Sequence, residues 1–154
     1  MERFCKTIDE LKQYYIEKGR NFTPYSQELI DAAVEKYGAL PSILIEYYQK
    51  IGEVEDLYSD PFHIFAPDDF YVWEADTNDY LIFSSEMQGV CDYGIRCSDL
   101  KEDNPVVYGS GDPYDEYETD MVSGLTYKKD YPNEVIHHES LLHWLNVVAL
   151  GEDL

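Results

Sequence analysis

Four histidines and three cysteines are the side chains whose types suggest metal chemistry, but their spacing does not match known metal sites. In the segment HHESLLH, His143 follows His138 by five residues, whereas zinc-protease helices place two histidines at i and i+4. Because each residue advances a helix by about 100°, these two side chains would lie on opposite sides of a helix. Cys91 and Cys97 have no C-x-x-C partner. We therefore predict no metal site.

Nucleophilic chemistry has one candidate pair, Cys91 with His63, which the sequence alone leaves open. No local signature supports it, and Cys91 lies within a predicted strand, where a buried cysteine usually acts as a small hydrophobic residue. The glycines around Ser110 lack the spacing and the following lysine of a phosphate loop. No serine lies in a G-x-S-x-G turn. We predict no catalytic residue and no cofactor.

The segment DPYDEYETD, residues 112–120, holds five carboxylates and two tyrosines. It does not fit a calcium loop, because Tyr117 would take the position that needs glycine and Ser123 would replace the closing glutamate. It is either a solvated loop or a contact loop in which tyrosines anchor a basic partner and carboxylates steer it. In the second case the partner-binding residues are Asp112, Tyr114, Asp115, Glu116, Tyr117, Glu118 and Asp120, with Glu74, Asp76 and Asp79 adding to the negative field.

The net charge narrows the class of partner. There are 32 acidic against 11 basic residues, which gives a formal net charge of -21. Nucleic acids and anionic membranes attract basic surfaces, so binding to either is disfavoured. A basic protein is favoured, because opposite fields accelerate encounter. The alternative is that the charge only keeps the protein in solution. Fifteen tyrosines suit either a thin core or a binding face.

The expected compartment follows from the cysteines and the hydrophobic runs. Three cysteines are an odd number without the spacing of a disulfide framework. The first residues lack the apolar segment of a signal peptide. No run approaches the roughly 18 apolar residues of a membrane span. We expect a cytoplasmic protein with reduced thiols.

Periodicity predicts helices first and strands afterwards. Apolar residues at helical spacing indicate helices over 7–18, 23–37 and 41–50, which Gly19, Gly38 and Gly52 end. Thr7 and Glu10 match a capping box, and Pro24 and Pro41 suit first helical turns. A closing helix is predicted over 139–150.

Strands are predicted between residues 61 and 128. The run 80–83 is too apolar for simple alternation, so we expect a central strand covered on both faces. Further strands are expected near 89–97, from residue 106, within 121–128 and, at an edge, over 61–65. Residues 68–76 are ambiguous between strand and helix, and 109–120 is read as loop. The predicted core includes Leu40, Leu44, Ile51, Leu81, Phe83, Val90, Ile95, Val107, Leu141 and Leu145.

Three stretches, taken in order, resemble the SUKH superfamily, which groups bacterial immunity proteins with fungal regulators of cell-wall synthesis. They are GALP restarting a helix that ends at Gly52, then YLIFSSEMQGVCDYGIR followed by DNPVVY, and finally ESLLHWLNVVAL. The resemblance covers about residues 35–150. The chain departs from it in having Ile51 before Gly52, where Asn is common, and Trp144 before Leu145, where Phe is common.

The resemblance implies a single α+β domain over 1–154, with a helical extension at 1–34 and a family-like core at 35–150. It implies a central mixed or antiparallel sheet flanked by N-terminal helices and a C-terminal helix. It also implies a non-enzymatic immunity protein that neutralises a cognate polymorphic toxin, of nuclease or deaminase type, by binding it. The alternative is a regulatory or scaffold module without a toxin partner, similar to the fungal members.

Overall fold

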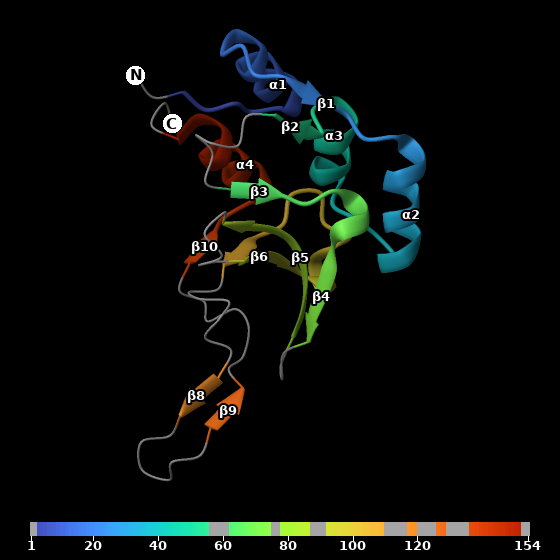
Figure 1. Cartoon of the computed structure of the whole chain (residues 1–154), viewed down its shortest axis with the longest axis vertical. Helices are drawn as coiled ribbons and strands as arrows, with labels where there is room; N and C mark the ends of the chain where they lie inside the picture. Colours follow the sequence, from blue (N-terminus) through green and yellow to red (C-terminus); the bar gives the residue numbers. More distant parts are fainter. Residues whose placement is uncertain are drawn as a thin grey trace.

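The computed structural model describes residues 3–55, 62–74, 78–86, 92–109, 117–119, 126–128 and 136–151. Helices α1 (Ile8–Glu17), α2 (Gln27–Tyr37) and α3 (Ser42–Lys50) precede a sheet, and α4 (Leu141–Leu150) follows it. Figure 1 shows α1, α3 and α4 gathered beside the sheet, and α2 packs on residues 67–69, just before β4. The predicted α+β class is confirmed. Within the described residues, no helix is both long and apolar enough to span a bilayer.

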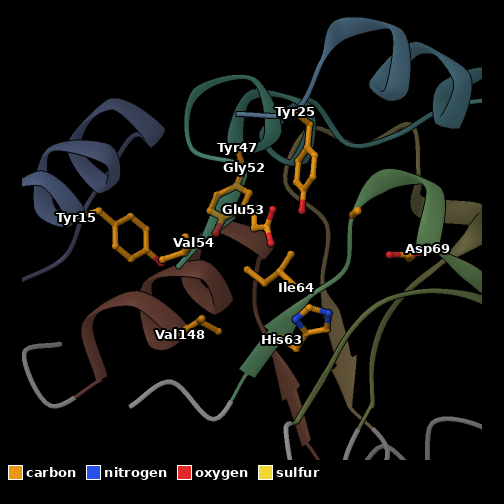
Figure 2. A pocket seen from close by; sticks show the side chains of 11 residues that line it. Tyr15, Tyr25, Tyr47, Gly52, Glu53, Val54, His63, Ile64, Asp69 and Val148 are labelled. Atoms are coloured by element: carbon orange, nitrogen blue, oxygen red, sulfur yellow. The ribbon is translucent and has the colours of Figure 1, made fainter. Parts of the chain in front are cut away.

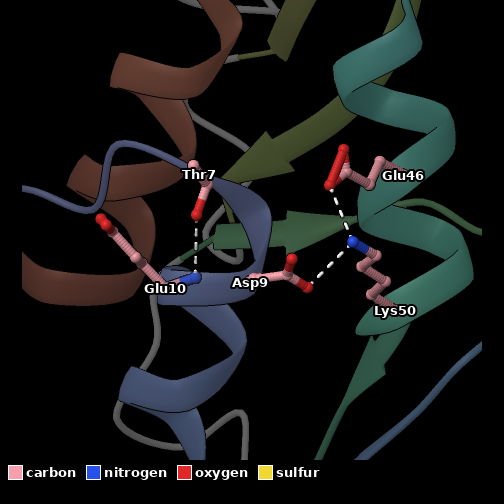
Figure 3. Close-up of polar contacts among 5 residues, drawn as sticks. All are labelled: Thr7, Asp9, Glu10, Glu46 and Lys50. Atoms are coloured by element: carbon pink, nitrogen blue, oxygen red, sulfur yellow. Dashed lines mark hydrogen bonds and ion pairs between the residues drawn. The ribbon is translucent and has the colours of Figure 1, made fainter.

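The start of α1 follows the predicted capping pattern. Thr7 is the N-cap, and its Oγ1 accepts a hydrogen bond from the Glu10 N–H at 3.1 Å. The Glu10 carboxylate accepts in turn from the Lys6 N–H at 2.6 Å. Figure 3 shows this cap beside Lys50 of α3, whose ammonium lies 2.9 Å from Asp9 on α1 and 3.0 Å from Glu46. Because these side chains are at least partly open to solvent, water and salt screen the ion pairs and they contribute little to stability.

The prediction that α2 begins at Thr23-Pro24 is wrong. The helix begins at Gln27, and the Oγ of its N-cap Ser26 accepts from the Leu29 N–H at 3.3 Å. A proline disfavours helical backbone at the residue before it, so Thr23 is extended. It joins Phe22 in strand β1 (Phe22–Thr23), which pairs with β2 (Glu53–Val54).

The main sheet is antiparallel in every described pair. Its strand order is β10-β7-β6-β5-β3, and β4 pairs with the other end of β5. The strands are β3 (Phe62–Ile64), β4 (Tyr71–Glu74), β5 (Asp79–Glu86), β6 (Asp92–Arg96), β7 (Val107–Gly109) and β10 (Ile136–His138). β3 ends this order, as predicted for an edge strand.

β5 is the predicted central strand, and both of its faces are covered. Leu81 and Phe83 belong to the main core, where the Phe83 ring meets Trp144 of α4 edge-on with centroids 4.9 Å apart. Tyr80 and Ile82 form a smaller cluster on the other face. Nine of the ten predicted core residues are buried, and Val90 lies outside the described residues.

Two loop predictions need revision. The ambiguous stretch 68–76 contains both alternatives, because the short helix η1 (Pro67–Asp69) is followed directly by β4. The stretch read as loop contains strand β8 (Tyr117–Thr119), which pairs with β9 (Thr126–Lys128), and its first residue, Gly109, belongs to β7. The many carboxylates of this stretch favoured the prediction of a loop, although Tyr117 and Thr119 are residue types that favour strands.

Helix α4 begins at Leu141 rather than at Glu139, because Ser140 is its extended N-cap. Asn146 is fully buried on this helix. Its Oδ1 accepts from the Cys5 N–H at 2.8 Å, and its Nδ2 donates to the Cys5 carbonyl at 3.0 Å and to the Leu142 carbonyl at 2.9 Å. One side chain therefore fixes the segment before α1 against the last helix.

Candidate functional site

A cavity of about 180 Å³ lies where β2 and β3 approach α1, α3, η1 and α4. Its aromatic lining comes from Tyr15, Tyr25 and Tyr47, and its polar lining from Glu53, His63 and Asp69. Tyr15 and Tyr47 are buried, whereas the three polar residues are exposed. Figure 2 shows these side chains around the cavity. The arrangement is an aromatic floor with an acidic rim.

Gly52 makes the turn that brings Glu53 to the rim. It follows α3 and has a φ of 76°, which side chains with a Cβ rarely adopt. A Cβ there would lie 2.6 Å from Cα of Pro24 and closer still to the Thr23 carbonyl oxygen. Only glycine lets residues 23–25 pack this closely. The same packing holds Tyr25, whose N–H donates to the Tyr48 carbonyl at 3.0 Å.

The opposite wall is held by Tyr48 of α3, which is fully buried. Its hydroxyl donates to the Phe65 carbonyl at 2.7 Å, and the Phe65 N–H donates to Phe83 of β5 at 2.8 Å. His63 lies on β3, where its carbonyl accepts from the Ser84 hydroxyl at 2.8 Å. The segment that carries His63 and Asp69 is thus tied both to the sheet and to α3.

The electrostatics of the cavity are negative. Burial, followed by the charges of Glu53, Asp69 and Asp68, raises the pKa of Tyr25 to about 12. Figure 2 shows the Tyr25 hydroxyl pointing between Glu53 and Asp69. The phenol keeps its proton beyond the pH at which an ordinary tyrosine ionises, and the cavity presents a neutral donor among carboxylates.

The middle of the chain contains no Lys or Arg. Residues 51–95 contain 11 Asp and Glu and no Lys or Arg. Most of the cavity lining comes from this segment. A cation from another segment contacts the lining, because the guanidinium of Arg20 lies 5.6 Å from the centroid of the Tyr15 ring. Arg20 itself does not line the cavity. The uninterrupted acidic segment is the sequence signal by which this site could have been found.

The predicted partner-binding residues are only partly placed. Glu74 and Asp79 are both exposed and face each other as partners on β4 and β5. Like charges directly opposite cost stability, so the fold keeps this pair at a local cost. Tyr117 and Glu118 lie on β8, opposite Lys128 and Tyr127 of β9. In Figure 1 this hairpin lies far from α1, β2 and β3, which frame the cavity. The other predicted residues lie outside the described ones: Asp76, Asp112, Tyr114, Asp115, Glu116 and Asp120.

The helical argument about His138 and His143 is wrong. His138 lies on β10 and His143 on α4, and their ring centroids are 5.7 Å apart. Helical rotation therefore does not separate them. In the part of the chain that the structure describes, no three His, Cys, Asp or Glu side chains gather closely enough to hold a metal. Of the alternative nucleophile pair, His63 lines the cavity and Cys91 lies outside the described residues.

No protein-family model, curated protein or solved structure matches the chain. The likeness to the SUKH superfamily therefore rests on the ordered sequence segments alone.

Proposed function

We propose that this protein is a non-enzymatic binding protein that neutralises a basic toxin by occluding it, in the manner of SUKH immunity proteins. The observation that carries the proposal is the net charge of -21, together with the unbroken acidic segment 51–95. Toxins that cleave or modify nucleic acids present basic surfaces to phosphates. Carboxylates placed against such a surface substitute for the phosphates and block access to it.

The geometry favours binding over catalysis. Glu53, His63 and Asp69 line one cavity, but the same lining holds three tyrosines, and the pKa of one of them, Tyr25, is raised to about 12. Carboxylates set beside aromatic rings are suited to holding a cation. Charge complementarity would act mainly on the rate of association and on the choice of partner.

Co-expression with the neighbouring open reading frames tests the proposal. Each neighbour is expressed in a host cell with and without this protein, and growth is measured. We expect one neighbour to arrest growth, this protein to restore it, and the two purified proteins to form a one-to-one complex. A growth-arresting neighbour with a basic domain that neither binds this protein nor is relieved by it would contradict the proposal.

A further inference from the structure

The cavity offers negative charge on two sides of one aromatic group. Glu53 follows α3 and Asp69 belongs to η1, and in Figure 2 they lie on either side of the Tyr25 hydroxyl. Since the chain supplies no Lys or Arg between residues 51 and 95, these carboxylates have no cation within their own segment. Both carboxylates are exposed, so they are open to a cation from another segment or from another molecule.

The aromatic lining suits a flat cation. Tyr25 is the partly exposed ring of the lining, whereas Tyr15 and Tyr47 are each 1% exposed and form the floor. A guanidinium gains attraction from the face of a tyrosine ring within about 6 Å. The protein already makes this contact within its own fold. The guanidinium of Arg96 lies 4.4 Å from the centroid of Tyr108, and that of Arg20 lies 5.6 Å from Tyr15.

The size of the cavity limits its occupant to one small group. Its volume of about 180 Å³ is below the roughly 300–1,000 Å³ of pockets that enclose drug-sized ligands. The exposed rim leaves an entrance for a side chain that projects from a larger surface. The walls are held in place by Gly52 and by the Tyr48 hydroxyl, so little ordering is needed on binding.

We propose that the cavity between Tyr25, Glu53 and Asp69 binds a guanidinium group, the head of an arginine side chain on the basic partner. This inference rests on the proposed function for the source of the arginine. A guanidinium fits better than an ammonium because it is planar, stacks on rings, is weakly hydrated and can donate to two carboxylates at once.

The test uses the full-length protein and small probes, so it needs no toxin. Backbone amide shifts are followed by NMR during titration with N-acetyl-arginine methylamide. The neutral isostere N-acetyl-citrulline methylamide and the ammonium N-acetyl-lysine methylamide serve as controls. We expect saturable shifts around Tyr25, Gly52 and His63 with a Kd of about 1 mM, and at least fivefold weaker binding of the lysine probe. No saturable shift at these amides, or equal shifts with citrulline, would overturn the proposal.

Paired variants separate the cavity from the overall field of the protein. E53Q/D69N removes two charges at the cavity, and E28Q/E35Q removes two from exposed positions on α2. The first is expected to weaken binding of the arginine probe at least tenfold and the second less than twofold. Equal effects would show that only the overall charge attracts the probe, and would overturn the site.

A third arm identifies the source of the guanidinium. Propylguanidine carries the same single charge and the same group without a peptide backbone. If the natural occupant is a residue of a partner, the capped arginine is expected to bind at least as tightly as propylguanidine. A tenfold preference for propylguanidine would overturn assignment to a partner's side chain. If none of these titrations showed binding, the guanidinium site would be refuted, but toxin neutralisation would still be decided by the growth-rescue experiment. The two proposals can therefore fail independently.

Discussion

Replacement of Asn146 by leucine should strongly destabilise the protein, because among the described residues Asn146 is the hydrogen-bond partner of both backbone groups of Cys5. Its amide accepts from the Cys5 N–H and donates to the Cys5 carbonyl, and the two residues are 141 positions apart in sequence. Both residues are buried, with 0% of Asn146 and 1% of Cys5 exposed. Leucine has the same number and branching of side-chain heavy atoms but no hydrogen-bonding group, so both backbone groups lose this partner.

The magnitude follows from the two groups left unpaired. Each buried, unsatisfied backbone group costs about 1–3 kcal/mol, so we expect a loss of about 2–6 kcal/mol in the free energy of unfolding. The Leu142 carbonyl adds little, because it also accepts the ordinary helical bond within α4. Since small domains are stable by about 5–15 kcal/mol, this single change should remove a large share of the total.

Urea denaturation of the wild type, N146L and a matched control measures the effect. Ser140→Ala is the control, because it removes the hydrogen bond from the His143 N–H at the start of the same helix and should cost only about 1 kcal/mol. Hydrogen exchange of the Cys5 amide reads the contact directly, and N146L should abolish its protection. A loss below that of Ser140→Ala, with Cys5 still protected, would refute the reasoning.

Three further predictions concern the core and the cavity. Gly52→Ala should destabilise the protein by at least about 2 kcal/mol more than Gly38→Ala in the same denaturation assay, because both have positive φ but only residue 52 would clash with backbone; equal losses would contradict the close packing of residues 23–25. Leu81→Ala should cost about 2–5 kcal/mol, because Leu81 is fully buried in the central strand, and an unchanged urea midpoint would contradict this. Tyr25 should titrate near pH 12 by ¹³C NMR of labelled tyrosine rings. Because the folded state binds this proton more tightly than the unfolded state, its contribution to stability is present below pH 10 and falls as pH rises towards 12. A midpoint near 10 would contradict the burial of this hydroxyl and the negative charge around it.

The sequence predicted the elements whose signals are local. Thr7 and Glu10 mark the start of α1 because a cap depends on neighbouring residues only. The apolar run of β5 indicated a strand covered on both faces, which the burial of Leu81 and Ile82 bears out. The start of α2 was misplaced because Pro24 fits either a helical first turn or an extended approach to one. The partner strand β2 decides between these, and it lies thirty residues further along the chain.

The cavity could not be predicted in the same way. Its lining comes from elements as distant as α1 and α4, and sequence spacing carries no information on which tyrosines converge. Asn146 is also invisible to pattern reasoning, because a single polar residue on an apolar helix gives no indication of a distant backbone partner. The five carboxylates within 112–120 led to the prediction of a contact loop there. The absence of Lys and Arg from residues 51–95 is the sequence feature that coincides with the cavity.

The most direct measurement of the central claim is the association rate with the growth-arresting neighbour at low and high salt. Long-range attraction between charges is screened over about 8–10 Å at physiological ionic strength. We expect association to slow roughly tenfold or more between low and high salt. At low salt, neutralising Asp112, Asp115 and Glu116 to Asn or Gln should slow association by a similar factor. Association rates indifferent to both salt and these substitutions would contradict the claim that an acidic surface selects a basic partner.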